Sequence, residues 1–384
     1  MKKVMLTVWL FLVSLVYACD LDYTGQTDST ICLQEIINNT NNVQLESGIL
    51  LINNNLNLHN QFEISGNNTQ IIGKFSKPET AFFKGIDVIN VKINNLQLTS
   101  SGKFESSLFV NPYSQLRGDA IGFTNLDRGI SIVGKSSLIN ISGVIIEGVE
   151  IGIEIDTKQH EGTQLIKYVD INNNVIKNVG KAGIRLINVN AVNIKYNLIE
   201  NVQGNMAYGK NPVLSDTKFG DGIYLNGFID GILENNTIKD VIRIGVVLEG
   251  YLNSDDIVIN LNDKVTINKN FIYNAINSRG TEHNAGIWVE PAVTFLHQMQ
   301  YKTDHVLIQD NVIFNTKSST SERENYGIFL GAMNATVIHN TIKWIDTGMM
   351  CYFGNIAFIN NIILTPTQYE LNNTPWIYLK ITYN

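Results

Sequence analysis

Residues 183–199 read Gly-Ile-Arg-Leu-Ile-Asn-Val-Asn-Ala-Val-Asn-Ile-Lys-Tyr-Asn-Leu-Ile and contain the two short patterns that decide the fold. The first pattern is a glycine, an apolar residue, any residue and a second apolar residue, here Gly183 to Leu186. The second is an asparagine, any residue and isoleucine, here Asn197 to Ile199. Apolar and other residues alternate within these runs, and a period of two is typical of β-strands.

The glycine pattern recurs along the chain, with one imperfect copy, at intervals of 21 to 41 residues. Its copies begin at Gly129, Gly152, Gly183, Gly222, Gly245, Gly286, Gly327 and Gly348. A repeat of this length indicates a solenoid, in which each repeat contacts only its neighbours. The shortest intervals correspond to a bare coil, and the longer ones to a coil that carries an inserted loop.

The asparagine pattern recurs at similar spacing, in phase with the glycines. Its copies begin at Asn174, Asn197, Asn236, Asn270, Asn311, Asn340 and Asn361. Asparagine tolerates left-handed backbone geometry and bonds nearby main chain, which suits a tight bend between two strands. Stacked bends of this kind predict an internal asparagine ladder, in which the amide groups satisfy one another.

These repeats predict an all-β protein, a right-handed parallel β-helix solenoid with a short N-terminal capping helix. A helix that starts near Asp28 would place Leu33, Ile36 and Ile37 on one face and cover the open end of the solenoid. At the other end, residues 376–383 could supply a strand that blocks the last coil.

The N-terminus has the features of an export signal. Lys2 and Lys3 precede an apolar stretch from Val4 to Val16, and Ala18 fits a cleavage site. We therefore expect a signal peptide at 1–18, an N-terminal cap at 19–42 and the β-helix at 43–384, in a secreted or extracytoplasmic protein.

The three cysteines leave an alternative open. Cys19 and Cys32 are close enough in sequence for a disulfide, which export would permit. Cys19 directly after the cleavage site would also suit a bacterial lipoprotein, whose lipid anchor would be the only contact with a membrane. Cys351 lies in an apolar run and is expected to be a buried free thiol.

Composition excludes one class of partner. The chain has 384 residues, of which 16% are charged, and a formal net charge of −7. It contains no cluster of lysine and arginine, so we expect no nucleic-acid partner. The sequence does not indicate an oligomeric state.

The N-terminal motif resembles that of the pectate lyase superfamily. The residues that carry the resemblance are Asp22-x-x-Gly25-x-x-Asp28-x-Thr30-x-x-x-Gln34, followed by the strand entry Gln44 to Gly48 and the coils described above. The resemblance covers nearly all of the chain after residue 18 and implies the β-helix fold. That superfamily includes lyases, glycosidases, epimerases, tailspikes and adhesins, so the resemblance does not imply one activity.

The catalytic motifs of the superfamily branches are missing. Residues 220–223, Gly-Asp-Gly-Ile, faintly resemble the Asn-Thr-Asp strand of the glycosidases. The paired Asp-Asp, Gly-His and Arg-x-Lys motifs of that branch are absent, as is the Asp-Pro-His motif of mannuronan epimerases. No catalytic residue can therefore be transferred from these families.

The strand period gives a map of the outer surface. The third residue of each glycine pattern should point outward, which places Tyr224, Trp288 and Phe329 beside Glu249 and Glu290. Sugar rings stack on exposed aromatic side chains, and carboxylates bond their hydroxyls or act on the glycosidic linkage. Alternatively, inserted loops fold over these aromatics and form a satellite core.

The role of the two glutamates stays open between three interpretations. Glu249 and Glu290 occupy equivalent positions on successive coils and could be an acid and nucleophile pair for glycoside hydrolysis. They could instead bind Ca²⁺ that bridges to an acidic sugar, although no metal ligand set can be assigned. They could also be two solvated carboxylates without a function.

Three further residues complete the candidate site. Asp221 precedes Gly222 at a turn and is expected to be accessible, as a catalytic carboxylate or as a turn cap. Arg243 could pair with a uronate carboxylate or hold Asp221 ionised. His283, in a loop before the Trp288 strand, could be a general base or simply exposed. Arg185 is expected to form a weak surface ion pair with Glu154.

These features favour an extracytoplasmic carbohydrate-active protein, a polysaccharide lyase or glycoside hydrolase that acts on an acidic polysaccharide in a cleft on the β-helix. Asp221, Glu249 and Glu290 are the candidate catalytic residues, and Tyr224, Trp288, Arg243, Phe329 and His283 the candidate substrate-binding residues. The alternative is a non-catalytic glycan-binding or adhesin-like surface protein.

Overall fold

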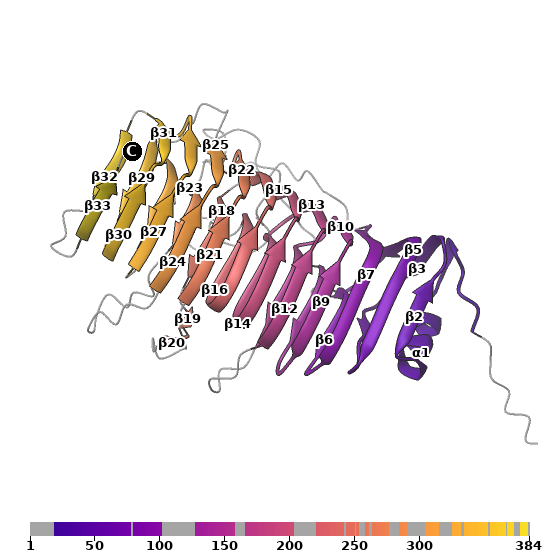
Figure 1. Cartoon of the computed structure of the whole chain (residues 1–384). Helices are drawn as coiled ribbons and strands as arrows, with labels where there is room; N and C mark the ends of the chain where they lie inside the picture. The colour runs from indigo at the N-terminus through magenta and orange to yellow at the C-terminus, as the bar shows by residue number, and fades with distance from the viewer. Residues whose placement is uncertain are drawn as a thin grey trace, which may run out of the picture.

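In the computed structural model, the chain winds into a long solenoid of parallel β-strands (Figure 1). The structure describes residues 19–77, 80–101, 127–157, 166–202, 220–241, 243–249, 251–252, 258–260, 263–275, 284–289, 304–314, 325–331, 334–351, 354–365, 367–371 and 377–382. The strands fall into three columns, called A, B and C in the order in which each coil visits them.

Column A contains the strands of the glycine pattern. Its members are β4 (Leu56–Asn57), β6 (Ala81–Ile86), β8 (Arg128–Val133), β11 (Ile151–Asp156), the first halves of β14 (Ala182–Lys195) and β16 (Asp221–Glu234), β18 (Ile244–Glu249), β23 (Asn284–Val289), β26 (Asn325–Leu330), β29 (Thr347–Cys351) and β32 (Thr367–Leu371).

Column B follows on each coil. It consists of β2 (Asn42–Leu45), the first parts of β5 (Phe62–Gly73) and β7 (Ile89–Ser100), β9 (Ser137–Ser142), β12 (Ile166–Asn172), the second halves of β14 and β16, β21 (Asp263–Asn268), β24 (Asp304–Gln309), β27 (Asn334–Ile338), β30 (Gly354–Ile359) and β33 (Ile377–Thr382).

Column C closes the coil. It consists of β1 (Thr24–Asp28), β3 (Gly48–Ile52), the last parts of β5 and β7, β10 (Ile145–Glu147), β13 (Val175–Val179), β15 (Leu198–Val202), β17 (Thr237–Val241), β22 (Phe271–Tyr273), β25 (Val312–Phe314), β28 (Thr341–Lys343) and β31 (Ile362–Leu364). A separate antiparallel pair joins β19 (Tyr251–Leu252) and β20 (Val258–Asn260).

The glycines of column A are required by the close packing of consecutive coils. A Cβ atom on Gly183 would lie 2.5 Å from Ile199 Cγ2 and 2.7 Å from the carbonyl oxygen of Gly222, the equivalent glycine of the next coil. Ile199 belongs to the Asn-x-Ile pattern, so the two patterns meet inside the solenoid. Ile184 and Leu186 also point inward and are completely buried, as the strand period predicts.

The predicted asparagine ladder is present at the bend between columns B and C. The Nδ2 group of Asn197 donates a hydrogen bond of 3.0 Å to Asn236 Oδ1, and Asn236 donates one of 2.9 Å to Asn270. The prediction was wrong about the backbone, because the left-handed residue is the one before each ladder asparagine, such as Tyr196 with φ 56°. The side chain of the asparagine therefore bonds the next coil while its predecessor makes the bend.

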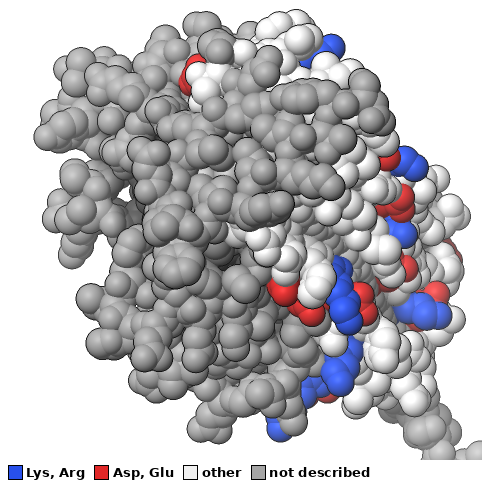
Figure 2. All heavy atoms as spheres, turned by 60° about the vertical axis from the view of Figure 1, so that its left-hand side comes forward, with Lys and Arg blue, Asp and Glu red and all other residues white. Residues whose placement is uncertain are grey.

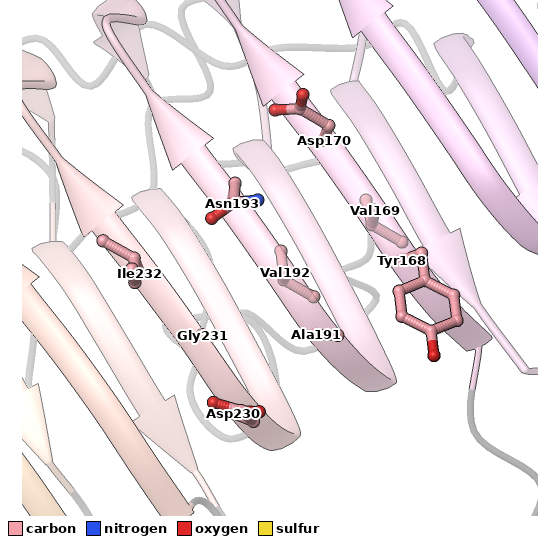
Figure 3. A pocket seen from close by; sticks show the side chains of 9 residues that line it. All are labelled: Tyr168, Val169, Asp170, Ala191, Val192, Asn193, Asp230, Gly231 and Ile232. Atoms are coloured by element: carbon pink, nitrogen blue, oxygen red, sulfur yellow. The ribbon is translucent and has the colours of Figure 1, made fainter.

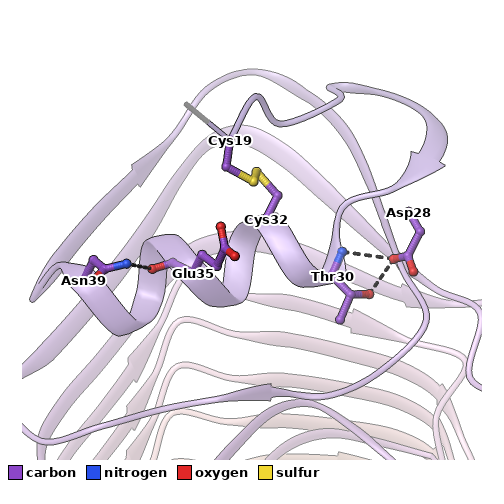
Figure 4. The surroundings of a disulfide bond; sticks show 6 residues. All are labelled: Cys19, Asp28, Thr30, Cys32, Glu35 and Asn39. Atoms are coloured by element: carbon purple, nitrogen blue, oxygen red, sulfur yellow. Dashed lines mark hydrogen bonds between the residues drawn. A yellow bond between two sulfur atoms is a disulfide. The ribbon is translucent and has the colours of Figure 1, made fainter. Parts of the chain in front are cut away.

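Helix α1 (Thr30–Asn39) lies at the N-terminal end of the solenoid. At the first residue of the helix, the N–H of Thr30 donates a hydrogen bond of 2.9 Å to the Asp28 carboxylate (Figure 4). Leu33 and Ile37 are completely buried in the same core cluster as the strands. A disulfide joins Cys19 to Cys32 on this helix, which is one of the two alternatives predicted for Cys19.

Further predictions concern the signal peptide, the last strand and Cys351. Residues 1–18 lie outside the described residues, so the signal peptide stays a prediction. The last strand, β33, pairs in parallel with β30 as an ordinary member of column B. Cys351 is a buried free thiol, as predicted, and burial raises its pKa to about 12. No helix in the described part of the chain is long and apolar enough to cross a membrane.

Candidate functional site

The outward positions of column A form one continuous row. Register pairs Glu154 with Arg185, Arg185 with Tyr224, Tyr224 with Val247, Val247 with Trp288, and Trp288 with Phe329. This order is the one that the glycine pattern predicts. The row changes character along its length, from charged side chains to aromatic ones.

The first half of the row, called the charge row, is centred on Glu154. The Glu154 side chain is only 2% exposed. Its Oε2 atom forms an ion pair with Arg128, with Nε 2.7 Å away, and accepts a hydrogen bond of 3.2 Å from the Ser131 hydroxyl. Its Oε1 atom accepts a hydrogen bond of 2.9 Å from Arg185 Nη1. Arg185 Nη1 also lies 3.2 Å from Asp156 Oδ2. The predicted weak surface pair of Arg185 and Glu154 is therefore wrong, because the carboxylate is buried and bonded on both oxygens.

Tyr224, Asn226 and Glu249 form a hydrogen-bonded group that we call the Tyr224–Glu249 centre. The Tyr224 hydroxyl donates to Glu249 Oε2 at 2.5 Å, and Asn226 Nδ2 donates to the Tyr224 oxygen at 3.1 Å. Asn226 Oδ1 is buried and has no hydrogen-bond partner within the described part of the chain. A buried acceptor without a partner costs free energy, so this amide is held in place by its bond to Tyr224 at some cost in stability.

The surroundings of Tyr224 keep its hydroxyl protonated. Burial raises the pKa of Tyr224 well above its usual range, and the charge and the hydrogen bond of Glu249 raise it further. Arg185, whose guanidinium carbon lies 6.0 Å from the centre of the tyrosine ring, acts in the opposite direction. Tyr224 is thus a proton donor at neutral pH, and Glu249 is its acceptor.

Asp221 is buried, which contradicts the prediction that its turn position makes it accessible. Its side chain is 2% exposed and accepts hydrogen bonds from Arg243 Nε at 2.7 Å and from Arg243 Nη2 at 2.9 Å. Arg243 therefore holds Asp221 and does not face a substrate, in agreement with one of its two predicted roles. Burial raises the pKa of Asp221 to about 6, while the Arg243 guanidinium lowers it and keeps the carboxyl ionised at neutral pH.

The second half of the row, called the aromatic stack, is a satellite core. Trp288 and Phe329 are parallel within 5°, with ring centres 3.8 Å apart. Phe329 is 8% exposed and Val247 is completely buried, and both pack with Ile244 and Tyr326 in a hydrophobic cluster. The satellite core was one of the two alternatives predicted, and Tyr224 and Trp288 lie partly buried against it. The inserted loops that were predicted to cover it lie mostly outside the described residues.

Two candidate residues cannot be placed. Glu290 and His283 lie outside the described residues, so the paired-glutamate and loop-base hypotheses stay predictions. Within the described part of the chain, no three His, Cys, Asp or Glu side chains gather as metal ligands. The face shown in Figure 2 mixes acidic and basic side chains among its described residues and has no large area of one sign.

Sequence reasoning missed the buried charge row and the role of Asn226. Both were visible in the outward map, since Ser131, Glu154 and Arg185 occupy one position on successive coils. The strand period gives the direction of these side chains. It does not give their solvent exposure, which depends on the residues that pack over them.

Comparison with known proteins concerns the fold. No protein-family model and no curated protein sequence matches the chain. Its structure is similar to the A-module of the mannuronan C-5 epimerase AlgE6 of Azotobacter vinelandii, with a TM-score of 0.59, 12% identity and coverage of 95% of this chain and 97% of that one.

Two further structures are similar over most of this chain. The surface adhesin PfbA of Streptococcus pneumoniae has a TM-score of 0.56 and 12% identity, with coverage of 91% and 88%. The catalytic domain of a GH87 alpha-1,3-glucanase has a TM-score of 0.56 and 14% identity, with coverage of 93% and 67%. Together with the parallel strand columns, these similarities establish the right-handed parallel β-helix of the pectate lyase-like fold.

Proposed function

We propose that this protein is an extracytoplasmic polysaccharide lyase that binds an acidic polysaccharide across column A and cleaves it at the Tyr224–Glu249 centre. The observation that carries the proposal is the hydrogen bond of 2.5 Å from the Tyr224 hydroxyl to Glu249, on the outer side of a rigid parallel sheet. It joins a proton donor to a proton acceptor at one point of the surface.

A uronate unit bound there would undergo β-elimination. Glu249 removes the proton from the carbon next to the uronate carboxyl group, and the electron pair forms a double bond to the neighbouring carbon. The bond from that neighbouring carbon to the glycosidic oxygen breaks, and the leaving oxygen takes the proton of Tyr224. Glu249 then returns its proton to Tyr224 through their hydrogen bond, which restores the centre without another reactant.

Arg185 supports an acidic substrate. Its guanidinium stands beside the Tyr224 ring and is only partly exposed, at 21%. A uronate carboxylate bound next to it would gain a charge-assisted hydrogen bond, and the cation would stabilise negative charge that develops during proton removal.

The described carboxylates favour elimination over hydrolysis. A retaining or inverting glycosidase needs two carboxyl groups that both face the scissile bond. Asp221, the second candidate near Glu249, is buried and occupied on both oxygens by Arg243. Glu290 remains the one candidate partner that would restore a hydrolase or a Ca²⁺ site.

The proposed location rests on the N-terminus. Lys2, Lys3 and the apolar stretch before Ala18 support removal of residues 1–18 on export. The mature chain would then begin at Cys19, whose disulfide with Cys32 ties the N-terminus to helix α1 at the end of the solenoid. Lipid attachment to Cys19 would require the same sulfur and would exclude that disulfide.

A non-catalytic glycan-binding protein is the second candidate. The partly buried rings of Tyr224 and Trp288, which pack against the hydrophobic cluster, support it, because rigid aromatic side chains can bind a sugar ring without chemistry. The similar structures include both polysaccharide-acting enzymes and an adhesin, so fold likeness favours neither candidate.

Turnover of acidic polysaccharides separates the candidates. The mature protein is incubated with polygalacturonate, alginate and hyaluronate, and ultraviolet absorbance reports unsaturated uronate while a reducing-end assay reports hydrolysis. We expect new absorbance, lost at least about 100-fold in Tyr224→Phe and Glu249→Gln, and retained in Tyr196→Phe, an exposed tyrosine on another part of the coil. Reducing ends without absorbance, or binding without any product, would contradict the lyase.

A further inference from the structure

Column B carries a depression of about 320 Å³ that is separate from the site on column A (Figure 3). It spans strands β12, β14 and β16, on three consecutive coils. We call it the Tyr168 depression, and its lining consists of Tyr168, Val169, Asp170, Ala191, Val192, Asn193, Asp230, Gly231 and Ile232.

The depression results from a small side chain between two larger ones. Register aligns Val169 with Val192 and Val192 with Gly231, so the preceding residues Tyr168, Ala191 and Asp230 occupy one position on three coils. Ala191 leaves space between the tyrosine ring and the Asp230 carboxylate, which stand on either side of it (Figure 3). The depression is therefore encoded by the sequence of one row.

A second row forms the other side. Asp170, Asn193 and Ile232 are aligned two residues further along the same strands. They add a carboxylate, an amide and an apolar side chain that face outward.

The backbone position of Tyr168 is left-handed on consecutive coils and is filled by residues of different types, such as Leu138 with φ 56°. Tyr168 has φ 59°, and Ala191 and Asp230 have φ 53° and 52°, so this position of the coil needs left-handed geometry. Asparagine, which occupies the position on an earlier coil as Asn90 with φ 58°, adopts that geometry at lower cost than a bulky residue. Tyr168 is 60% exposed and so recovers little through packing. Tyr168 thus presents its ring to solvent at one end of the depression and adds apolar surface to the lining.

The lining selects a neutral, hydroxyl-rich ligand. The Tyr168 ring and Ile232 offer apolar surface to the face of a sugar ring, while Asp170, Asp230 and Asn193 offer acceptors and a donor for its hydroxyls. None of the nine lining residues is cationic, and two are carboxylates, so a uronate would be repelled. The charge preference is opposite to that proposed for column A.

We infer that the Tyr168 depression is a second glycan-binding site, which takes a neutral pyranose unit stacked on Tyr168 with its hydroxyls bonded by Asp170, Asn193 and Asp230. It would hold the protein on a neutral glycan while column A faces outward on another side of the solenoid. The inference does not depend on the activity proposed for Tyr224 and Glu249.

Two substitutions test the site without disturbing the backbone. Tyr168→Asn removes the ring and suits the left-handed position, which Asn90 already occupies. Ala191→Lys fills the depression, and Lys264, with φ 52°, shows that lysine is accepted at the equivalent position of a later coil. Tyr196→Asn is the matched control, because Tyr196 is also left-handed, with φ 56°, and 56% exposed, but lies outside the depression.

Saturation-transfer NMR with maltohexaose, cellohexaose, laminarihexaose and hexagalacturonate gives the readout for the mature protein. We expect at least one neutral hexasaccharide to bind, about tenfold more weakly in Tyr168→Asn, not at all in Ala191→Lys, and unchanged in Tyr196→Asn. The melting temperature of Tyr168→Asn should be equal to or above that of the wild type, because strain is relieved.

Binding that survives both substitutions overturns the inference, and so does the failure of all three neutral probes to bind. Loss of binding in Tyr168→Asn together with a lowered melting temperature would also contradict it. Failure of the lyase assay affects none of these results, since hexagalacturonate reports on column A and the neutral sugars on column B.

Discussion

The charge row and the aromatic stack occupy the same column of strands, in the same register. Ion pairs and hydrogen bonds stabilise the charge row, whereas apolar packing stabilises the aromatic stack. In the charge row, Glu154 is bonded to two arginines from neighbouring coils. In the aromatic stack, Trp288 and Phe329 pack face to face over a small hydrophobic cluster. Tyr224 lies where the two meet and combines an aromatic ring with a bonded hydroxyl.

The comparison shows how a solenoid separates fold from function. The inward residues of both halves are alike, with Ile153 and Ile328 completely buried at equivalent positions. The outward residues are not constrained by the core, so they can change from one coil to the next. A catalytic or binding group can therefore arise at the border where charged outward side chains on one coil adjoin aromatic ones on the next.

The largest expected effect concerns the ion pair beneath this border. Asp221→Ala should lower the free energy of unfolding by about 3–5 kcal/mol, because the buried guanidinium of Arg243 would lose the carboxylate that bonds it at two nitrogens. Chemical denaturation measures the change. The double variant Asp221→Leu with Arg243→Met should lose less than the single one, and an equal or larger loss would show that the pair does not act as a unit.

Removal of an aromatic ring tests the second half of the row. Phe329→Ala should cost about 2–4 kcal/mol, since the ring is nearly buried and the substitution leaves a cavity. Trp344→Ala is the control, because Trp344 is 63% exposed and should change the free energy of unfolding by less than about 0.5 kcal/mol. Similar losses in the two variants would refute the satellite core.

The charge row should respond to loss of a single charge. Glu154→Gln is expected to cost about 1.5–3 kcal/mol, because two arginines lose a buried charged acceptor. Glu200→Gln, whose ion pair with Lys239 is about one-third exposed, should cost less than about 1 kcal/mol. If both variants lose the same amount in denaturation, Glu154 is only a surface residue.

The smallest effect is expected at the border itself. Tyr224→Phe removes two hydrogen bonds, the one donated to Glu249 and the one accepted from Asn226, and should cost about 1–2 kcal/mol. Because the pKa of Tyr224 is raised in the fold above the value of about 10 in an unfolded chain, its contribution is complete below pH 10 and is lost as the pH rises further. The variant should therefore lose less stability than the wild type between pH 10 and 11, and an identical decline would contradict the raised pKa.

Most of the fold could be predicted from local pattern. Gly183 and Ile199 meet inside one coil, so glycine and Asn-x-Ile repeats specify the strands, their inward faces and the asparagine ladder. The register of the outer row followed from the same repeats, which placed Tyr224, Trp288 and Phe329 at the same position of their coils.

Burial of the outer row could not be predicted in the same way. Asp221 was expected to be accessible because it lies at a turn, but Arg243 from the following coil reaches it and removes it from solvent. For Phe329 the outward direction left an exposed aromatic surface and a satellite core as alternatives, and a hydrophobic cluster surrounds it. Strand periodicity gives the direction of a side chain but not the residues that cover it, so neither outcome could be derived from the repeat.

The most direct test of the central claim is a crystal structure of the Glu249→Gln variant with a bound uronate oligosaccharide. The proposal predicts a sugar chain that crosses the strands of column A, with one glycosidic oxygen within hydrogen-bond distance of the Tyr224 hydroxyl and a carboxylate next to Arg185. A uronate chain bound elsewhere, or bound on column A without contact to Tyr224, would contradict it.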